Sequence, residues 1–207
     1  VRELQDRGHE TFVTAREKEV TTDLLDAYDI DYEVLSTQAD STPRLLIEWA
    51  VRELKLVRAI RAFGSDVVVS HLSPVAAQAA RLTGTPSVTF TDDEVETRSL
   101  RRLTLPFTSR VCTPAGFELD LGEKHRRYDG YHELAYLHPD RFDPDPARLD
   151  DRGVAVDEPY YVLRFVSWAA HHDVGRSGFS REAKRELVEY LDSRGTVYIT
   201  SESELPP

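Results

Sequence analysis

The residues best suited to chemistry follow an apolar, strand-like run in RFVSWAAHHDVG, residues 164–175. His171, His172 and Asp173 come shortly after Trp168 and before a glycine. Because an imidazole titrates near neutral pH, either histidine is a candidate general acid or base, and the aspartate is a third catalytic candidate. Adjacent side chains diverge, so the two histidines do not readily chelate one ion. No other spacing in the chain supports a zinc motif, and we expect no metal.

Arg164 is a candidate substrate-binding residue in the strand that precedes these histidines, and Trp168 is another. Alternate side chains of a strand share a face, which places Arg164 with Val162 and Val166. A strand covered on both faces would bury this guanidinium. A buried guanidinium needs a partner, which here is either a carboxylate such as Asp173 or an anionic ligand.

Three further polar segments follow predicted strands, where ligands bind in open parallel sheets. The candidate substrate-binding residues in them are Ser70, His71, Asp92, Asp93, Glu94, Tyr131 and Glu133, and the last segment also carries His132. Each segment has a structural interpretation as well. His71 could bond the amides of the next helix, residues 92–94 could form an acidic first helical turn, and HRRY at 125–128 could be a solvated charge run.

The elements that must position these residues alternate between strands and helices. Apolar and β-branched runs predict strands at 10–15, 32–36, 66–71, 86–91, 109–113, 160–168 and 196–200. Apolar spacings of three and four predict helices at 17–28, 43–64, 73–82, 96–103 and 180–195, with Ser73 and Ser180 as N-caps. Such alternation implies right-handed βαβ units and an open parallel sheet, an α/β fold.

The segment 138–159 differs in composition, because it is rich in proline and aspartate. We interpret it as a connector between two domains. The sequence thus predicts a Rossmann-like domain over 1–137 and the start of a second Rossmann-like domain over 160–207. The chain has no methionine and opens in what looks like the middle of a helix, so we expect it to be a piece of something longer.

Composition excludes several classes of protein. Among 207 residues, 40% are hydrophobic and 30% charged, which is typical of a soluble globular protein, and no apolar run is long enough to span a membrane. The net charge of −11 argues against nucleic acid as a partner. Cys112 is the only cysteine, which excludes an internal disulfide and fits a reducing, cytoplasmic location.

The basic residues are almost all arginine, with Lys18, Lys55, Lys124 and Lys184 as the only lysines. A strongly acidic chain with few lysines is typical of proteins from salt-loving archaea. On that interpretation, the acidity keeps the protein soluble in brine and says nothing of the substrate.

Three motifs together carry a resemblance: RLTLPF at 102–107, GYHELAYLHP at 130–139 and RFVSWAAHHDVG at 164–175. They resemble an archaeal family of unknown function that is similar to UDP-N-acetylglucosamine 2-epimerases and GT-B glycosyltransferases. The resemblance implies two Rossmann-like domains that face a cleft, with a nucleotide sugar held mainly by the second. The family begins with a strand and loop before the helix at 1–8, and relatives contact the nucleotide through a later glycine-rich segment. This sequence contains neither.

The resemblance implies a nucleotide-sugar enzyme that performs glycosyl transfer or 2-epimerisation without a cofactor, with small-molecule acceptors and a possible homodimer as partners. Two alternatives remain open. One is a non-catalytic sugar-nucleotide-binding or assembly module that has kept the cleft. The other is a metal-dependent hydrolase that uses the run from His171 to Asp173.

Overall fold

The computed structural model describes residues 1–18, 20–37, 42–165 and 178–201. They divide into two compact units, Val1–His132 and Glu133–Pro207, and each is considered by itself. Among the described residues, no helix combines the length and hydropathy that a membrane span requires.

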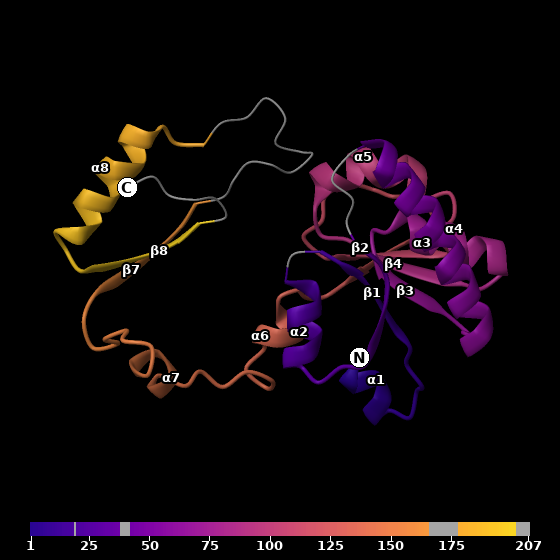
Figure 1. Ribbon diagram of the computed structural model, residues 1–207, viewed down its shortest axis with the longest axis horizontal. Coiled ribbons are helices and arrows are strands. Elements are labelled where there is room, and N and C mark those ends of the chain that lie inside the picture. The colour runs from indigo at the N-terminus through magenta and orange to yellow at the C-terminus, as the bar shows by residue number, and fades with distance from the viewer. Residues whose placement is uncertain (19, 38–41, 166–177, 202–207) are drawn as a thin grey trace. The chain divides into compact units, whose positions relative to one another are not determined.

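The first unit alternates helices and strands along most of its length (Figure 1). Its helices are α1 (Arg2–Asp6), α2 (Thr21–Ala27), α3 (Thr42–Phe63), α4 (Pro74–Thr83) and α5 (Glu94–Thr104). Its strands are β1 (Val13–Glu17), β2 (Tyr32–Thr37), β3 (Val68–His71), β4 (Ser87–Phe90), β5 (Arg110–Pro114) and β6 (His125–Tyr128). All pairings are parallel, which confirms the predicted sheet type.

The strands of the first unit form two sheets, whereas the sequence predicted one open sheet. One sheet has the order β3-β4-β5-β6, and the other consists of β1 and β2. Among the described residues, β3 is hydrogen-bonded only to β4, and β1 only to β2, so each of the two strands is an edge. Side-chain patterns predict strands but not which edges meet, and the split was therefore not foreseen.

Local signals explain where α4 begins and ends. The Ser73 side chain accepts a hydrogen bond from the backbone N–H of Ala76 at 3.3 Å, and Pro74 occupies the first helical position. Gly84 ends the helix with a φ of 75°, a conformation that glycine adopts without strain. The alanines of α4 are buried, and their small side chains let α4 lie close to α3. Val57 and Ile60 of α3 contribute side chains to the core between the two helices.

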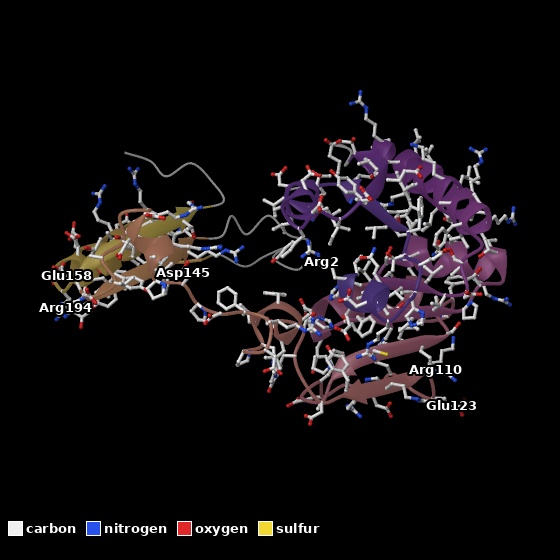
Figure 2. The ribbon with its side chains drawn as sticks, turned by 90° about the horizontal axis from the view of Figure 1, so that it is seen from below. Arg2, Arg110, Glu123, Asp145, Glu158 and Arg194 are labelled. Carbon is white, nitrogen blue, oxygen red and sulfur yellow. The ribbon has the colours of Figure 1, made fainter. Side chains whose placement is uncertain are left out.

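The run HRRY is strand β6, not a solvated charge run. It pairs with β5, with Val111 opposite His125 and Pro114 opposite Tyr128. Arg126 and Arg127 are exposed while the two end residues are half-buried, so this edge strand carries one arginine on each of its two faces. Figure 2 shows Arg110 and Glu123 where β5 and β6 begin, at the amino edge of the sheet.

The second unit contains a parallel pair, β7 (Tyr160–Phe165) and β8 (Thr196–Ser201), joined through α8 (Arg181–Asp192). Ser180 caps α8 as predicted, since its hydroxyl accepts the backbone N–H of Ala183 at 3.2 Å. The short helices α6 (Leu134–Leu137) and α7 (Ala147–Asp150) precede β7, and α7 lies within the predicted connector.

Candidate functional site

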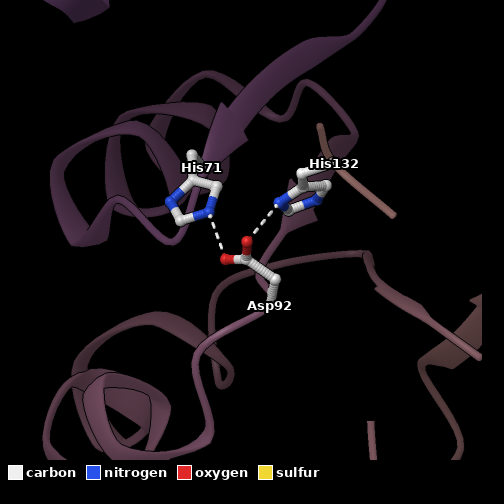
Figure 3. A group of neighbouring side chains, drawn as sticks. All are labelled: His71, Asp92 and His132. Carbon is white, nitrogen blue, oxygen red and sulfur yellow. Dashed lines mark hydrogen bonds and ion pairs between the residues drawn. The ribbon is translucent and has the colours of Figure 1, made fainter. Parts of the chain in front are cut away.

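Three side chains, one from the end of a strand and two from loops, come together at the carboxyl edge of the four-stranded sheet (Figure 3). His71 is the last residue of β3, and Asp92 follows the neighbouring strand β4 by two residues. His132 follows the edge strand β6 by four residues. We call these three residues the His-Asp-His cluster.

Each oxygen of the Asp92 carboxylate faces a different imidazole. The Nε2 atom of His71 lies 3.2 Å from Oδ1 of Asp92, and the Nδ1 atom of His132 lies 3.1 Å from Oδ2. The side chains of His71, Asp92 and His132 are 53%, 38% and 24% exposed, so the cluster is open to solvent on the His71 side. A ligand can therefore reach the carboxylate.

Aromatic contacts fix the ring of His132. It stacks on Tyr128 with 5.9 Å between ring centroids, and its edge faces Phe90 at 6.1 Å and His71 at 5.3 Å. The Nε2 atom of His132 is buried and has no hydrogen-bond partner among the described residues. With Nδ1 directed at Asp92, this ring is held in one orientation by packing.

The charge of Asp92 is set by opposing effects. Burial alone would raise the pKa of this carboxyl group. The hydrogen bond from His71 and the charges of His132 and His71 together outweigh burial, and the net shift of the pKa is downward. Asp92 is therefore ionised at neutral pH.

The backbone beside the cluster is strained. Leu72 follows His71 directly, is 3% exposed and has a φ of 25°. Non-glycine residues rarely adopt a positive φ, and buried packing must hold such a residue in place. The Leu72 N–H donates to the carbonyl of Phe90 at 2.9 Å, which extends the β3–β4 ladder past His71. This turn directs the chain from His71 into the cap of α4.

The other predicted site residues do not join this cluster. Ser70 is half-buried and alternates with His71 along β3, so it belongs to the opposite face of the sheet. The Glu94 carboxylate accepts the backbone N–H of Glu118 at 2.7 Å, which tethers the segment after β5. Tyr131 is exposed.

Some predicted residues lie elsewhere or outside the described chain. Asp93 is half-buried next to Asp92, and Glu133 is exposed in the second unit, directly before α6. Trp168, His171, His172 and Asp173 lie outside the described residues, and their proposed roles stay predictions.

The segment after β6 contributes His132 to the cluster, whereas the sequence predicted its neighbours Tyr131 and Glu133 as site residues. Recognition of HRRY as an edge strand would have found His132, because the loop after that strand then reaches the same sheet edge as Asp92. Two adjacent arginines between His125 and Tyr128 do not give the alternation of apolar and polar residues that identifies a strand in a sequence.

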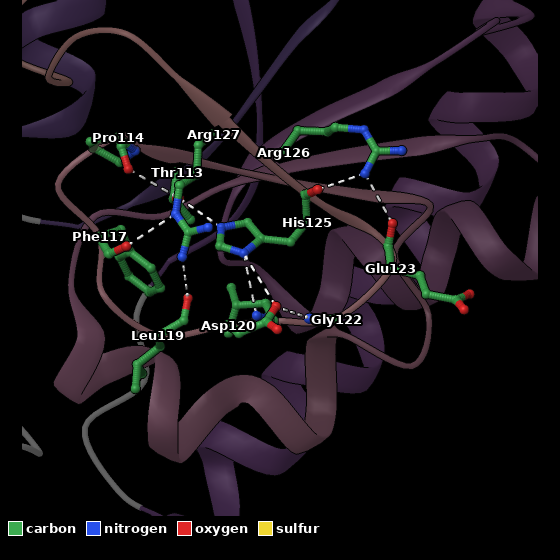
Figure 4. A network of polar contacts seen from close by, with 11 residues as sticks. Thr113, Pro114, Phe117, Leu119, Asp120, Gly122, Glu123, His125, Arg126 and Arg127 are labelled. Carbon is green, nitrogen blue, oxygen red and sulfur yellow. Dashed lines mark hydrogen bonds and ion pairs between the residues drawn. The ribbon is translucent and has the colours of Figure 1, made fainter.

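A second polar network is structural (Figure 4). The Nδ1 atom of His125 accepts the backbone N–H of Leu121 at 3.3 Å, so Nε2 carries the hydrogen and donates to the Thr113 hydroxyl at 2.8 Å. Burial, followed by the charge of Arg127, lowers the pKa of His125. Arg127 donates to the carbonyl of Phe117 at 3.2 Å. These contacts hold the loop between β5 and β6, and His125 is neutral.

Arg164 is exposed, which corrects the prediction that strand parity buries it. It does share a face with Val162, but Val162 is 64% exposed. The opposite face of β7 carries the buried Phe165, and the Lys184 ammonium of α8 lies 5.0 Å from that ring centroid. Among the described residues, α8 thus covers one face of this strand, whereas the prediction assumed cover on both.

We expect Arg164→Lys to change the free energy of unfolding by no more than about 0.5 kcal/mol, because exposed substitutions have small effects. Phe165→Ala is the matched contrast on the covered face and should cost about 3 kcal/mol. Urea denaturation of both variants, followed by circular dichroism, measures the difference. A loss above about 1 kcal/mol for Arg164→Lys would show that this face is covered after all.

No family model matches the chain, and neither does any curated protein. Two similar solved structures are UDP-N-acetylglucosamine 2-epimerases. The enzyme from Rickettsia bellii has a TM-score of 0.60 at 14% identity, over 97% of this chain and 57% of that one. The enzyme from Neisseria meningitidis, bound to UDP-GlcNAc, has a TM-score of 0.54 at 14% identity, over 98% of this chain and 67% of that one.

A third similar structure is MurG from Acinetobacter baumannii, with a TM-score of 0.49 at 13% identity, over 100% of this chain and 61% of that one. The chain spans about three fifths of the length of these proteins. Together with the parallel sheets, the two epimerase structures confirm the predicted fold class: α/β and GT-B-like, with a Rossmann-type domain followed by a second, smaller Rossmann-like unit.

Proposed function

We propose that this chain belongs to a nucleotide-sugar enzyme of GT-B type, which performs glycosyl transfer or sugar 2-epimerisation. The observation that carries the proposal is the His-Asp-His cluster at the carboxyl edge of the β3–β6 sheet. In open parallel sheets ligands bind at this edge. The epimerase from Neisseria meningitidis, which shares the fold, was solved with UDP-GlcNAc bound, and a UDP-sugar is therefore the first substrate to test.

Both reactions require a proton to move at a hydroxyl or at a carbon next to one. The cluster offers an ionised carboxylate with two imidazoles at 3.1 and 3.2 Å, and its exposed side admits a sugar or acceptor hydroxyl. Such positioned groups contribute about 10²–10⁴-fold to rate. We assign contact with the reacting hydroxyl to this cluster, and the role of Arg164 in substrate binding stays a separate prediction.

The proposal predicts that Asp92→Asn lowers kcat of the full-length protein at least on the order of 100-fold, because the amide cannot accept a proton or hold both imidazoles. Release of UDP and formation of a C2 epimer from UDP-sugars are the two readouts. Asp66→Asn is the matched control, since Asp66 is exposed and precedes β3 at the opposite edge of the sheet. It should retain full activity.

The rival function is a binding or assembly module that has kept the fold without turnover. It predicts that the wild-type protein binds UDP-sugars but releases neither UDP nor an epimer at any acceptor concentration. Equal turnover of Asp92→Asn and wild type would show that the cluster takes no part in the reaction. The proposed function would then rest on the fold alone.

A further inference from the structure

We propose that the His-Asp-His cluster binds one divalent transition-metal ion of the zinc type, with Nε2 of His71, Nδ1 of His132 and one carboxylate oxygen of Asp92 as ligands. These three ligand atoms lie within 4.8 Å of one another. The inference concerns this cluster alone and stands whether or not the protein acts on nucleotide sugars.

The distances suit tetrahedral coordination. Zinc binds imidazole nitrogen and carboxylate oxygen at about 2.0–2.2 Å, which puts neighbouring ligand atoms of a tetrahedron about 3.4 Å apart. In the cluster, Nε2 of His71 lies 3.2 Å from Oδ1 of Asp92 and Nδ1 of His132 lies 3.1 Å from Oδ2, and one oxygen and both nitrogens lie within 4.8 Å of one another. Small rotations of the side chains therefore bring the three atoms around an ion, without movement of the backbone.

The ligands are held in place before an ion arrives. His132 is fixed by the stacked ring of Tyr128 and the edge of Phe90, and His71 ends a strand that is paired with β4. Because folding already orders these side chains, little conformational entropy is lost when an ion binds.

The donor set selects the kind of ion and leaves room for a ligand. Two imidazole nitrogens and one carboxylate suit zinc and neighbouring transition metals, whereas magnesium and calcium prefer oxygen ligands alone. Three protein ligands leave a fourth position for water or a substrate oxygen, the arrangement of catalytic rather than structural zinc sites. The exposed side of His71 and Asp92 is where that position opens.

The test uses the 207-residue chain without an affinity tag, stripped with a chelator and dialysed. Calorimetry with zinc chloride should show one ion bound per chain, and the same titration with magnesium chloride should show no binding at equal concentration. Cobalt(II) gives a second readout that needs no variant. A tetrahedral site with nitrogen and oxygen ligands should produce intense visible absorption, and zinc should displace it.

Variants locate the site. Asp92→Asn and His132→Gln should each weaken zinc binding on the order of 100-fold. His138→Gln is the matched control, because His138 is exposed and pairs with Asp140 at 3.6 Å, outside the cluster. The double change of His171 and His172 to glutamine tests the other histidine-rich segment, and it should leave zinc affinity unchanged. Circular dichroism confirms that each variant is folded.

Three results would overturn the proposal: zinc binding no tighter than magnesium binding, cobalt absorption of octahedral intensity only, or zinc affinity lost with His171 and His172 but kept in Asp92→Asn. None of these three results depends on enzyme turnover. An active enzyme that binds no zinc would contradict the metal site and leave the proposed function standing. A protein that binds zinc without turnover would contradict the proposed function and leave the metal site standing.

Discussion

Glu48→Gln is expected to lower the free energy of unfolding of the first unit by about 2–3 kcal/mol. Glu48 on α3 accepts hydrogen bonds from Arg16 on β1 at 3.0 Å, from Ser36 on β2 at 2.6 Å and from Arg52 one turn along its own helix at 3.1 Å. Its side chain is 10% exposed. The glutamine would leave two partly buried guanidiniums without the carboxylate that offsets their charge.

The effect should depend on pH. Burial raises the pKa of Glu48, but hydrogen bonds from Arg16 and Ser36 and the charge of Arg52 outweigh burial and leave the pKa below its usual 4.5. A carboxyl group with a lowered pKa stabilises the fold above its unfolded pKa, and this contribution is lost as pH falls through the folded value. The difference in the free energy of unfolding between wild type and Glu48→Gln should therefore become smaller below pH 4.5.

Urea denaturation followed by Trp49 fluorescence measures this difference, because Trp49 packs against the core that α3 shares with α4. A Trp168→Phe background removes the other tryptophan. Glu33→Gln is the matched control, since Glu33 is exposed on β2. Equal losses of stability in the two variants would show that the Glu48 network has no net effect on stability. A difference that does not change with pH would show that the ionised form of Glu48 is not its source.

Features set by neighbouring residues were predictable from the sequence. The caps at Ser73 and Ser180 follow from side chains within a few positions. The β-branched run before His71 identified β3 in the same way. These signals were sufficient for the α/β class, because alternating strands and helices leave few ways to bury both kinds of apolar face.

Features that depend on distant partners were not predictable. Strand β6 is fixed by pairing with β5 and by Arg127, which reaches the carbonyls of Phe117 and Leu119 at 3.2 Å. The burial of Arg164 was unpredictable for the same reason. The sequence correctly predicted that Arg164 shares a face of its strand with Val162, but whether other elements cover that face depends on distant parts of the chain.

The cluster combines both situations. Ser70-His71 and Asp92-Asp93 were recognised as strand-end residues, and β3 and β4 pair directly, so His71 and Asp92 meet through one local βαβ unit. His132 joins them only because β5 and β6 extend the sheet in a particular order. Metal-ligand spacings in the sequence do not reveal such a set, since its members lie far apart in sequence, at the end of one strand and in two loops.

Gly195→Ala is expected to destabilise the β7–β8 pair by about 3 kcal/mol, at the upper end of overpacking effects. A Cβ at this position would lie 2.2 Å from the carbonyl oxygen of Pro159 and 2.9 Å from its carbonyl carbon. Both are backbone atoms, which cannot rotate away as a side chain can. The sequence predicts a helix that ends at Gly195, yet α8 ends at Asp192, and close approach to Pro159 is what requires glycine.

The clash has a specific structural consequence, because the same Pro159 carbonyl accepts the N–H of Thr196 at 3.2 Å, where the two strands begin to pair. Movement of Pro159 to admit the methyl group would break that bond and loosen the pair from its amino end. Hydrogen exchange should therefore show faster exchange of the amides of β8 in Gly195→Ala. Gly116→Ala is the matched control, since a Cβ there meets nothing within 4 Å. The first unit should keep its Trp49 fluorescence in both variants, and unchanged protection of β8 in Gly195→Ala would show that the turn accommodates a methyl group by another route.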